Sequence, residues 1–287
     1  FGSLNTFKKE YVDSDIRETL ESNLSLLEKS LRQIMIRRMK KDVLSQLPSR
    51  RDIYMPITAG VHERKEYDAI IEQMKNDLEG GGGGILPLLN RLQQFSAHPA
   101  LIDQSINTDV NSLISASAKF EVLFIKLSKI ALQKEKVIIF VTFRHAIDLI
   151  FSAIKEKFGI NAGIIDGRTP NENRQMLIDD FSASLGFNVL ILHPKTAGMG
   201  LNITSATNVI HYCRQWNPAL EAQATARAWR NGQKEIVDVY YFYYSDTVEE
   251  VIDERIKLKQ ELSERVVSIS DNKETDKKIM IEYLENL

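Results

Sequence analysis

Short β-rich runs alternate with helical patterns from about Lys119 onward, and this alternation constrains the fold more than any other feature of the sequence. Two of the intervening segments, 146–158 and 171–181, carry apolar residues at helical spacing. Strands joined through helices pair in parallel, and the helices cover both faces of the sheet. The sequence therefore predicts an α/β lobe with a doubly wound parallel sheet, with strands at 137–141, 162–165, 189–192, 209–212 and 237–243.

Helical segments are expected on either side of this lobe. We interpret residues 1–117 as a helical arm and linker region, 118–245 as the lobe, and 246–287 as a C-terminal amphipathic brace helix, ending near Val267, with a charged tail. Within the first region we expect helices at 16–39, 61–78 and 85–95 and a short strand at 52–57.

Five consecutive glycines, residues 80–84, separate two of these helices. Such a run holds neither helix nor strand without a large entropic cost. Phosphate-binding glycine loops contain Lys, Ser or Thr and follow a strand, so we assign these glycines no catalytic role. An artificial linker that replaces an insertion is the favoured interpretation, and a natural loop is the alternative.

The composition indicates a globular protein. The 287 residues are 43% hydrophobic, which suffices for a sizeable core. Cys213 is the only cysteine, which fits a reducing compartment, and no histidines have ligand spacing, so we predict no metal site. A net charge of −2 means that contacts with nucleic acid come from local patches. We find no membrane span and no signal peptide, and we expect no membrane partner.

A short helix with two arginines is predicted between Asn217-Pro218, a cap and first helical residue, and Asn231-Gly232, a stop. On this helix Gln223, Arg227 and Arg230 fall at i, i+4 and i+7, along one stripe. Neighbouring guanidinium groups repel unless an anion lies between them, and their planar forks match phosphate oxygens. The stripe therefore predicts a polyphosphate site. The alternative is that the arginines only offset the helix dipole.

The surrounding sequence resembles a known family. Residues 191–204 and 216–233 are similar to motifs V and VI of Swi/Snf-type ATPases, DNA translocases related to superfamily-two helicases. Residues 137–143 resemble motif IV. Further blocks at 36–48, 89–101 and 166–181 extend the resemblance over nearly the whole chain. It implies a RecA-like helicase C-terminal lobe.

The resemblance also implies roles for the arginines and for the loop before them. Arg227 and Arg230 occupy the two arginine positions of motif VI, with Arg230 as the arginine finger and Gln223 beside the nucleotide. Glycines in the loop 198–202 allow a close approach of the backbone to a ligand. The alternative is that this loop has a purely structural role. The implied nucleotide-binding residues are Gln223, Gly198, Gly200 and Asn202.

DNA contacts are expected mainly with phosphates, because a translocase moves along any sequence. The motifs follow strands, so we expect them, and the arginines with them, at the rim where parallel strands end. For Trp216, the alternative to a DNA contact is a packing role. The resemblance implies DNA contacts at Thr142, Phe143, Arg144, Gly167, Arg168, Lys195, Thr196, Trp216 and Asn217.

The sequence contains no Gly-x-x-x-x-Gly-Lys-Ser/Thr loop and no Asp-Glu-x-His-like motif. The resemblance therefore implies that an upstream RecA-like lobe holds ATP and Mg²⁺, and that this chain alone hydrolyses ATP negligibly. The expected partners are that lobe and double-stranded DNA without sequence specificity. A catalytically silent DNA-binding or protein-interaction module and an RNA helicase lobe are the alternatives.

Several positions depart from the usual family residues and suggest a divergent, prokaryotic branch. We accordingly expect a cytoplasmic, nucleoid-associated protein, or a nuclear one if the source is eukaryotic. The departures are His193-Pro194, Cys213, Ala226, Trp229 and Asn231.

Overall fold

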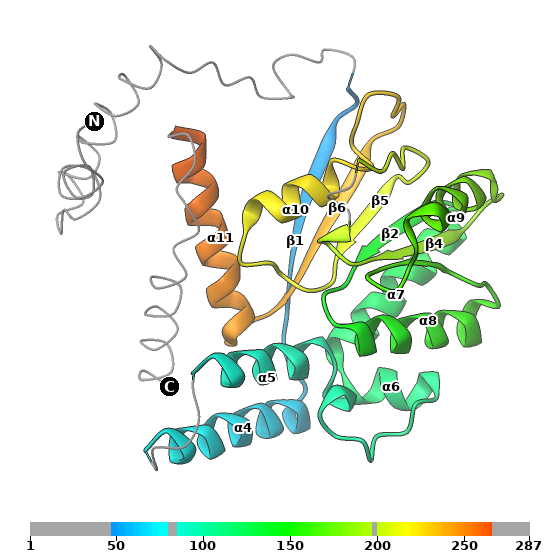
Figure 1. Ribbon diagram of the computed structural model, residues 1–287. Coiled ribbons are helices and arrows are strands. Elements are labelled where there is room, and N and C mark those ends of the chain that lie inside the picture. Colours follow the sequence, from blue (N-terminus) through cyan, green and yellow to red (C-terminus); the bar gives the residue numbers. More distant parts are fainter. Residues whose placement is uncertain (1–46, 80–84, 197–199, 266–287) are drawn as a thin grey trace.

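A six-stranded sheet, all of it parallel, forms the centre of the part of the chain that the computed structural model describes, residues 47–79, 85–196 and 200–265 (Figure 1). The strand order β1-β6-β5-β2-β4-β3 confirms the predicted α/β class with a RecA-like lobe. The predicted helix at 16–39, the glycines at 80–84, Gly198 and the tail from residue 266 lie outside the described residues. The strands are β1 (Arg50–Ile57), β2 (Lys136–Phe140), β3 (Gly163–Ile165), β4 (Asn188–Leu192), β5 (Asn208–His211) and β6 (Val237–Tyr244).

Helices cover both faces of this sheet, as the alternation predicted. One face packs against α6 (Val110–Ala116), α7 (Ala118–Leu132) and α8 (Arg144–Phe158). The other face packs against α9 (Asn171–Ala183) and α10 (Pro218–Thr225). Successive residues of β2 face opposite sides of the sheet. Ile139 therefore packs in the core on the α7 and α8 side, and Ile138 packs in the core on the α9 and α10 side.

The strand expected at 52–57 is confirmed, and it belongs to the sheet. β1 pairs with β6 from Arg50 opposite Val237 to Ile57 opposite Tyr244. The segment before residue 117 therefore supplies an edge strand of the lobe as well as helices. From Asp52 to Ile57 its exposed and more buried residues alternate, and Ile53, Met55 and Ile57 pack against the core, which is typical of a strand with one buried face.

Three helices build a smaller apolar cluster beside the lobe, and a 3₁₀ turn, η1 (Pro99–Leu101), follows the second of them. They are α4 (Val61–Glu79), α5 (Ile85–Ala97) and α11 (Val248–Arg265), which correspond to the helices predicted at 61–78, at 85–95 and after the sheet. Tyr67, Leu92 and Ile252 are fully buried between them. The C-terminal helix thus packs on the helices of the arm.

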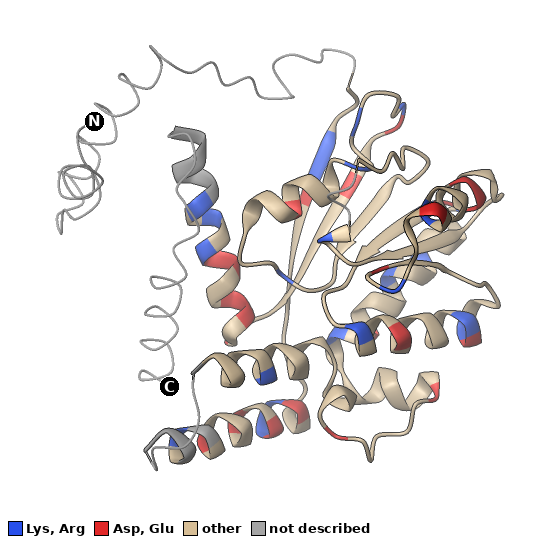
Figure 2. Cartoon of the chain, in the orientation of Figure 1, with Lys and Arg blue, Asp and Glu red and all other residues tan. Residues whose placement is uncertain are grey.

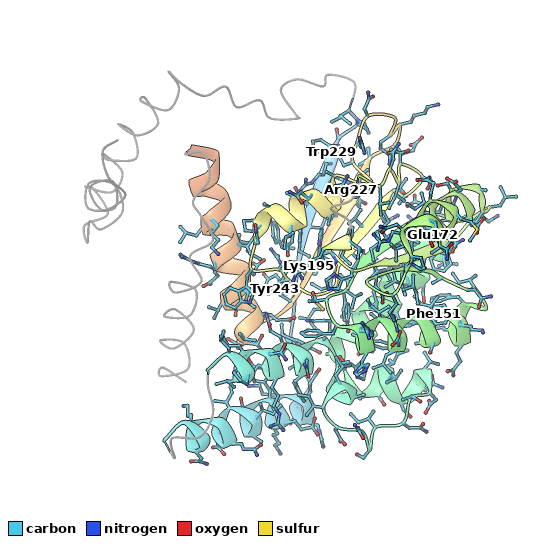
Figure 3. The ribbon with its side chains drawn as sticks, in the orientation of Figure 1. Phe151, Glu172, Lys195, Arg227, Trp229 and Tyr243 are labelled. Atoms are coloured by element: carbon cyan, nitrogen blue, oxygen red, sulfur yellow. The ribbon has the colours of Figure 1, made fainter. Side chains whose placement is uncertain are left out.

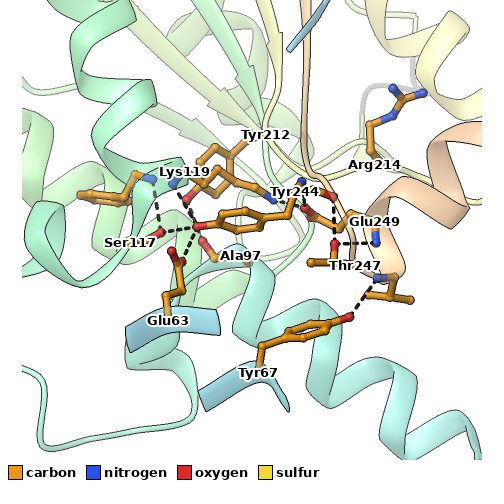
Figure 4. Close-up of polar contacts among 12 residues, drawn as sticks. Glu63, Tyr67, Ala97, Ser117, Lys119, Tyr212, Arg214, Tyr244, Thr247 and Glu249 are labelled. Carbon is orange, nitrogen blue, oxygen red and sulfur yellow. Dashed lines mark hydrogen bonds and ion pairs between the residues drawn. The ribbon is translucent and has the colours of Figure 1, made fainter. Parts of the chain in front are cut away.

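Buried polar side chains join this helical cluster to the sheet (Figure 4). Lys119 on α7 and Glu249 on α11 form an ion pair with side chains 0% and 4% exposed. The Tyr244 hydroxyl contacts the Glu63 carboxylate of α4 and accepts the Lys119 backbone N–H at 2.9 Å. The Ser117 hydroxyl lies 3.1 Å from the same Tyr244 oxygen. One polar network therefore links α4, α7, β6 and α11.

Candidate functional site

The helix predicted to carry the arginines begins as expected and ends early. Asn217 caps α10, its side chain accepting the Ala219 N–H at 2.8 Å, and Pro218 is the first helical residue. The prediction that the helix reaches Arg230 is wrong, because α10 ends at Thr225. Residues 226–230 form a series of turns, which we call the arginine turn.

Hydrogen bonds to other parts of the chain explain this early end. The Arg227 N–H donates to Ala224 three residues back, so the helical i→i−4 ladder is already broken. The Arg227 carbonyl accepts the Ile203 N–H at 3.0 Å, from the loop after β4. A regular i, i+4, i+7 stripe therefore does not exist. The two arginines are instead held by a tertiary contact.

The two guanidinium groups lack a counter-charge in the described residues. Arg227 is half-buried, and its Nε is buried without a hydrogen-bond partner in the described part of the chain. Burial lowers the pKa of Arg227, and the neighbouring charge of Arg230 lowers it further. No described carboxylate forms an ion pair with either arginine. Such a pair of cations favours an anionic ligand.

The predicted nucleotide loop reaches the arginine turn. The Arg230 Nη1 donates to the Gly200 carbonyl at 3.4 Å, and Gly200 has a φ of 78°, which favours glycine. Asn202 and Gln223 are exposed. The structure thus brings Gly200, Arg227 and Arg230 together. Within the described ranges no hydrogen bond joins Gln223 to either arginine, so its role stays a prediction.

The arginine turn does not lie at the rim where the strands end, and that expectation is wrong. The Trp229 ring N–H donates to the Pro48 carbonyl at 2.8 Å, two residues before β1 begins. The Arg50 guanidinium carbon lies 5.6 Å from the centre of the Trp229 ring. In Figure 3, Arg227 and Trp229 lie toward the start of β1. Because α10 runs back from the strand ends, the residues that follow it approach the opposite end of the sheet.

Candidate DNA-binding residues do follow the ends of β2, β3 and β4. Arg144 and Lys195 are exposed cations that form no ion pair in the described part of the chain. The Thr142 hydroxyl accepts the Gln215 amide N–H at 2.5 Å, and the buried Thr196 hydroxyl donates to the His193 carbonyl at 2.7 Å. Figure 2 shows both signs of charge interspersed over the helices, so any cationic surface is local.

Arg168, next to Gly167 in the loop after β3, is already paired with two carboxylates. It lies 2.8 Å from Asp148 and 2.7 Å from Asp166, with its own side chain 40% exposed. Hydrogen bonds to these carboxylates raise the pKa of Arg168. The local charge is therefore not positive, which makes Arg168 a weaker phosphate ligand than Arg144 or Lys195.

The aromatic candidates are partly buried and contribute to packing. Trp216 packs against the cluster of α4, α5 and α11, and its carbonyl accepts the Lys259 amine at 3.2 Å. Phe143 packs against the core on the α7 and α8 face. Asn217 is engaged as the α10 cap. The structural alternative considered for Trp216 therefore has support, and DNA contacts at these residues stay predictions.

A buried charge cluster beside the site was not predicted from the sequence. Arg214 donates twice to Glu221 of α10, each time at 3.1 Å, and also contacts Asp253 of α11. All three side chains are 1% exposed. Glu221 stands three residues before the buried Ala224, a spacing that places both on one face of α10, and this spacing was the one available signal. Its partners lie too far along the chain to be identified from spacing.

Two further features of the described residues concern metal ions and membranes. Within the described ranges, no group of three His, Cys, Asp or Glu side chains is placed to hold a metal ion. A search of the same residues finds no helix with the length and apolar character required to cross a membrane. What the described chain offers is a pair of uncompensated arginines and a separate set of polar groups at strand ends.

Comparisons with known proteins identify two domain families along the chain. The SNF2-related domain matches residues 1–101, and the helicase conserved C-terminal domain matches residues 119–232. The Zorya protein ZorD of Escherichia coli O139:H28 is 35% identical over 286 residues, 91% of this chain and 26% of ZorD. The chain spans about a quarter of the length of the curated relatives it matches, which come from bacteria and plants among other sources.

Solved structures show the same fold. The Sulfolobus solfataricus SWI2/SNF2 ATPase core in complex with dsDNA is 26% identical, with a TM-score of 0.63 over 91% of this chain and 55% of that one. The C-terminal part of the Fun30 ATPase domain has a TM-score of 0.69 at 21% identity, over 84% of this chain and 98% of that one. The chain belongs to the Swi/Snf family and contains the family's helicase conserved C-terminal domain.

Proposed function

We propose that this chain is the C-terminal motor lobe of an ATP-dependent double-stranded DNA translocase. The observation that carries the proposal is the arginine turn, where Arg227 and Arg230 lie together without a carboxylate partner among the described residues and the buried Nε of Arg227 has no acceptor. A phosphate group would supply the missing acceptors. In this proposal the ATP and Mg²⁺ are held mainly by an upstream lobe.

The arginine turn suits the electrostatics of phosphoryl transfer. Negative charge on the transferring group is stabilised best by cations that are already positioned and partly desolvated. Arg227 is fixed through its carbonyl, which accepts the Ile203 N–H, while Arg230 extends to the Gly200 loop. We assign Arg230 as the arginine finger. Arg227 orients the phosphates, with Gln223, Gly198 and Asn202 close to the nucleotide.

The strand-end rim is the proposed DNA surface. Arg144 and Lys195 are exposed cations at this rim, and Thr142, whose hydroxyl accepts from Gln215, precedes Phe143 and Arg144 after the end of β2. The dsDNA bound to the Sulfolobus solfataricus relative supports double-stranded DNA as the partner. Contacts with phosphates give binding without sequence preference. Such a protein works in the nucleoid of a prokaryotic cell or in the nucleus of a eukaryotic one.

Measuring ATP hydrolysis with three nucleic acids tests this function. The full-length protein is expected to be stimulated by double-stranded DNA more than by single-stranded DNA or RNA, and residues 1–287 alone are expected to show no turnover. Stimulation by RNA would favour an RNA helicase. A folded full-length protein that stays inactive with every nucleic acid would contradict the proposal and favour a silent binding module.

The rim makes a separate prediction about salt. Replacing Arg144 with alanine should reduce the slope of log K against log salt by about one, because one phosphate contact is lost. Arg168→Ala is the matched control, since Asp148 and Asp166 already neutralise that guanidinium. Its slope should change much less. Equal slopes for the two variants in a DNA-binding titration would rule out this assignment of the rim.

A further inference from the structure

His211, the last residue of β5, lies in the middle of the sheet and is 0% exposed. Its Nε2 is 2.8 Å from the hydroxyl oxygen of Thr225, the final residue of α10. Its Nδ1 is buried and has no hydrogen-bond partner in the described part of the chain. The imidazole therefore makes one polar contact, and that contact is with the residue from which the arginine turn starts.

Stacked rings fix the orientation of this imidazole. Phe140, His211, Tyr241 and Tyr54 are register partners on β2, β5, β6 and β1. Their ring centres are 5.1, 4.9 and 5.0 Å apart in that order, and the His211 and Tyr241 rings are within 5° of parallel. Rings on both faces of the imidazole oppose its rotation. The position of Nε2 is thus set by the sheet.

The imidazole is neutral and donates from Nε2. Burial lowers the pKa of His211 well below its usual range, and the charges of Arg214 and Arg50 lower it further. A neutral imidazole has a single N–H. With the proton on Nδ1, that N–H would be buried and unpaired, which is costly, whereas on Nε2 it donates to Thr225.

Thr225 transmits this position to the arginine turn. Its carbonyl accepts two backbone N–H groups, from Ala228 at 3.1 Å and from Trp229 at 3.0 Å. These are the two residues that lie between Arg227 and Arg230 in the chain. Thr225 itself is 0% exposed, so its hydroxyl meets no solvent. The placement of both guanidinium groups therefore depends on where this residue is held.

We propose that His211 is a positioning residue for Arg227 and Arg230, acting through the Thr225 hydroxyl. The inference rests on the proposed function, because it assigns the arginine turn to ATP hydrolysis. His211 touches no nucleotide in this proposal. It fixes the start of the turn from the rigid centre of the sheet, and a displacement of about 1 Å at a reacting group costs on the order of 10²-fold in rate.

Two substitutions at His211 in the full-length protein distinguish the contribution of the hydrogen bond to Thr225 from the contribution of ring stacking. His211→Phe keeps a ring between Phe140 and Tyr241 but removes the N–H, whereas His211→Gln keeps an N–H donor. We expect His211→Phe to lower kcat for DNA-stimulated ATP hydrolysis by about 10- to 100-fold, with a much smaller change in KM for ATP. We expect His211→Gln to recover most of that loss. Thr225→Val, which removes the hydroxyl, should lower kcat as much as His211→Phe does. It replaces His211→Phe as the test variant if His211→Phe fails to fold.

Double substitutions show whether His211 acts through the arginine turn. In a background with both Arg227→Lys and Arg230→Lys, which keeps the two charges but removes both guanidinium groups, His211→Phe should have little further effect on kcat. A full additional loss in that background would indicate a general structural role and overturn the inference. Wild-type kcat in folded His211→Phe and Thr225→Val, with Arg227→Ala inactive, would overturn it and leave the proposed function intact. Normal turnover in both Arg227→Ala and Arg230→Ala would instead reject the proposed function itself.

Discussion

Arg230→Ala in the full-length protein is expected to lower kcat for DNA-stimulated ATP hydrolysis by about 10³- to 10⁵-fold, the effect of removing an arginine finger. The Arg230 guanidinium reaches only the Gly200 carbonyl among the described residues, so its loss leaves no buried carboxylate unpaired and costs little stability. The change in rate should therefore not be accompanied by unfolding. ATP turnover with saturating double-stranded DNA measures it.

A matched arginine elsewhere provides the control for this substitution. Arg91 is exposed on α5, outside the arginine turn and the rim, so Arg91→Ala should keep wild-type turnover. DNA affinity should be unchanged in Arg230→Ala, because the proposed DNA contacts lie at the opposite end of the strands. Normal turnover in Arg230→Ala would remove the finger assignment. Loss of DNA binding would show that the two surfaces are not separate.

Lys119→Met is expected to destabilise the fold by about 3–5 kcal/mol, since it leaves the Glu249 carboxylate buried without its cation. Glu249 is 4% exposed, and burial raises the pKa of this carboxyl even beside Lys119. Removal of Lys119 increases the cost of keeping it ionised. Denaturant unfolding of residues 1–287 measures the effect.

Removing both charges should restore most of this stability. The double variant Lys119→Met with Glu249→Gln leaves no unpaired ion, and replacing a whole buried pair is often close to neutral. Lys129→Met, at an exposed position of the same helix α7, is the control and should change stability by less than about 0.5 kcal/mol. Equal losses in the single and double variants would show that packing, and not the ion pair, sets the stability here.

The alternation of strand and helix patterns sufficed to predict the parallel sheet. Four of the strands, β2, β4, β5 and β6, are almost fully buried, so hydrophobic pattern and element type agree there. β1 was harder to assign to the sheet. Its sequence, RRDIYMPI, alternates from Asp52 to Ile57, which predicts a strand with one buried face but not the sheet that the strand joins. The pairing with β6 is a contact between residues far apart in the chain.

The sequence nominated residues for the site, and their roles stay predictions, whereas the geometry predicted for the two arginines was wrong. Asn217-Pro218 fixed the start of α10 by local rules of capping, which spacing can detect. Its end depends on the Ile203 N–H, which takes the Arg227 carbonyl out of the helical ladder, and no local pattern records such a contact. Sequence patterns likewise identify His211 only as a residue of a strand. Its stacking with Phe140 and Tyr241 depends on contacts between strands that the sequence does not reveal.

The pairing of β1 with β6 has a mechanical consequence. The chain enters the lobe at the start of β1 and leaves it for α11 at the end of β6, and the two strands run in parallel through eight paired positions. A pulling force between these two points acts along the strands and loads the whole ladder of hydrogen bonds in shear. Pairs cannot be peeled apart one at a time in that geometry. If the lobe is the proposed motor, a force applied between these two points is therefore resisted by all of the β1–β6 hydrogen bonds together.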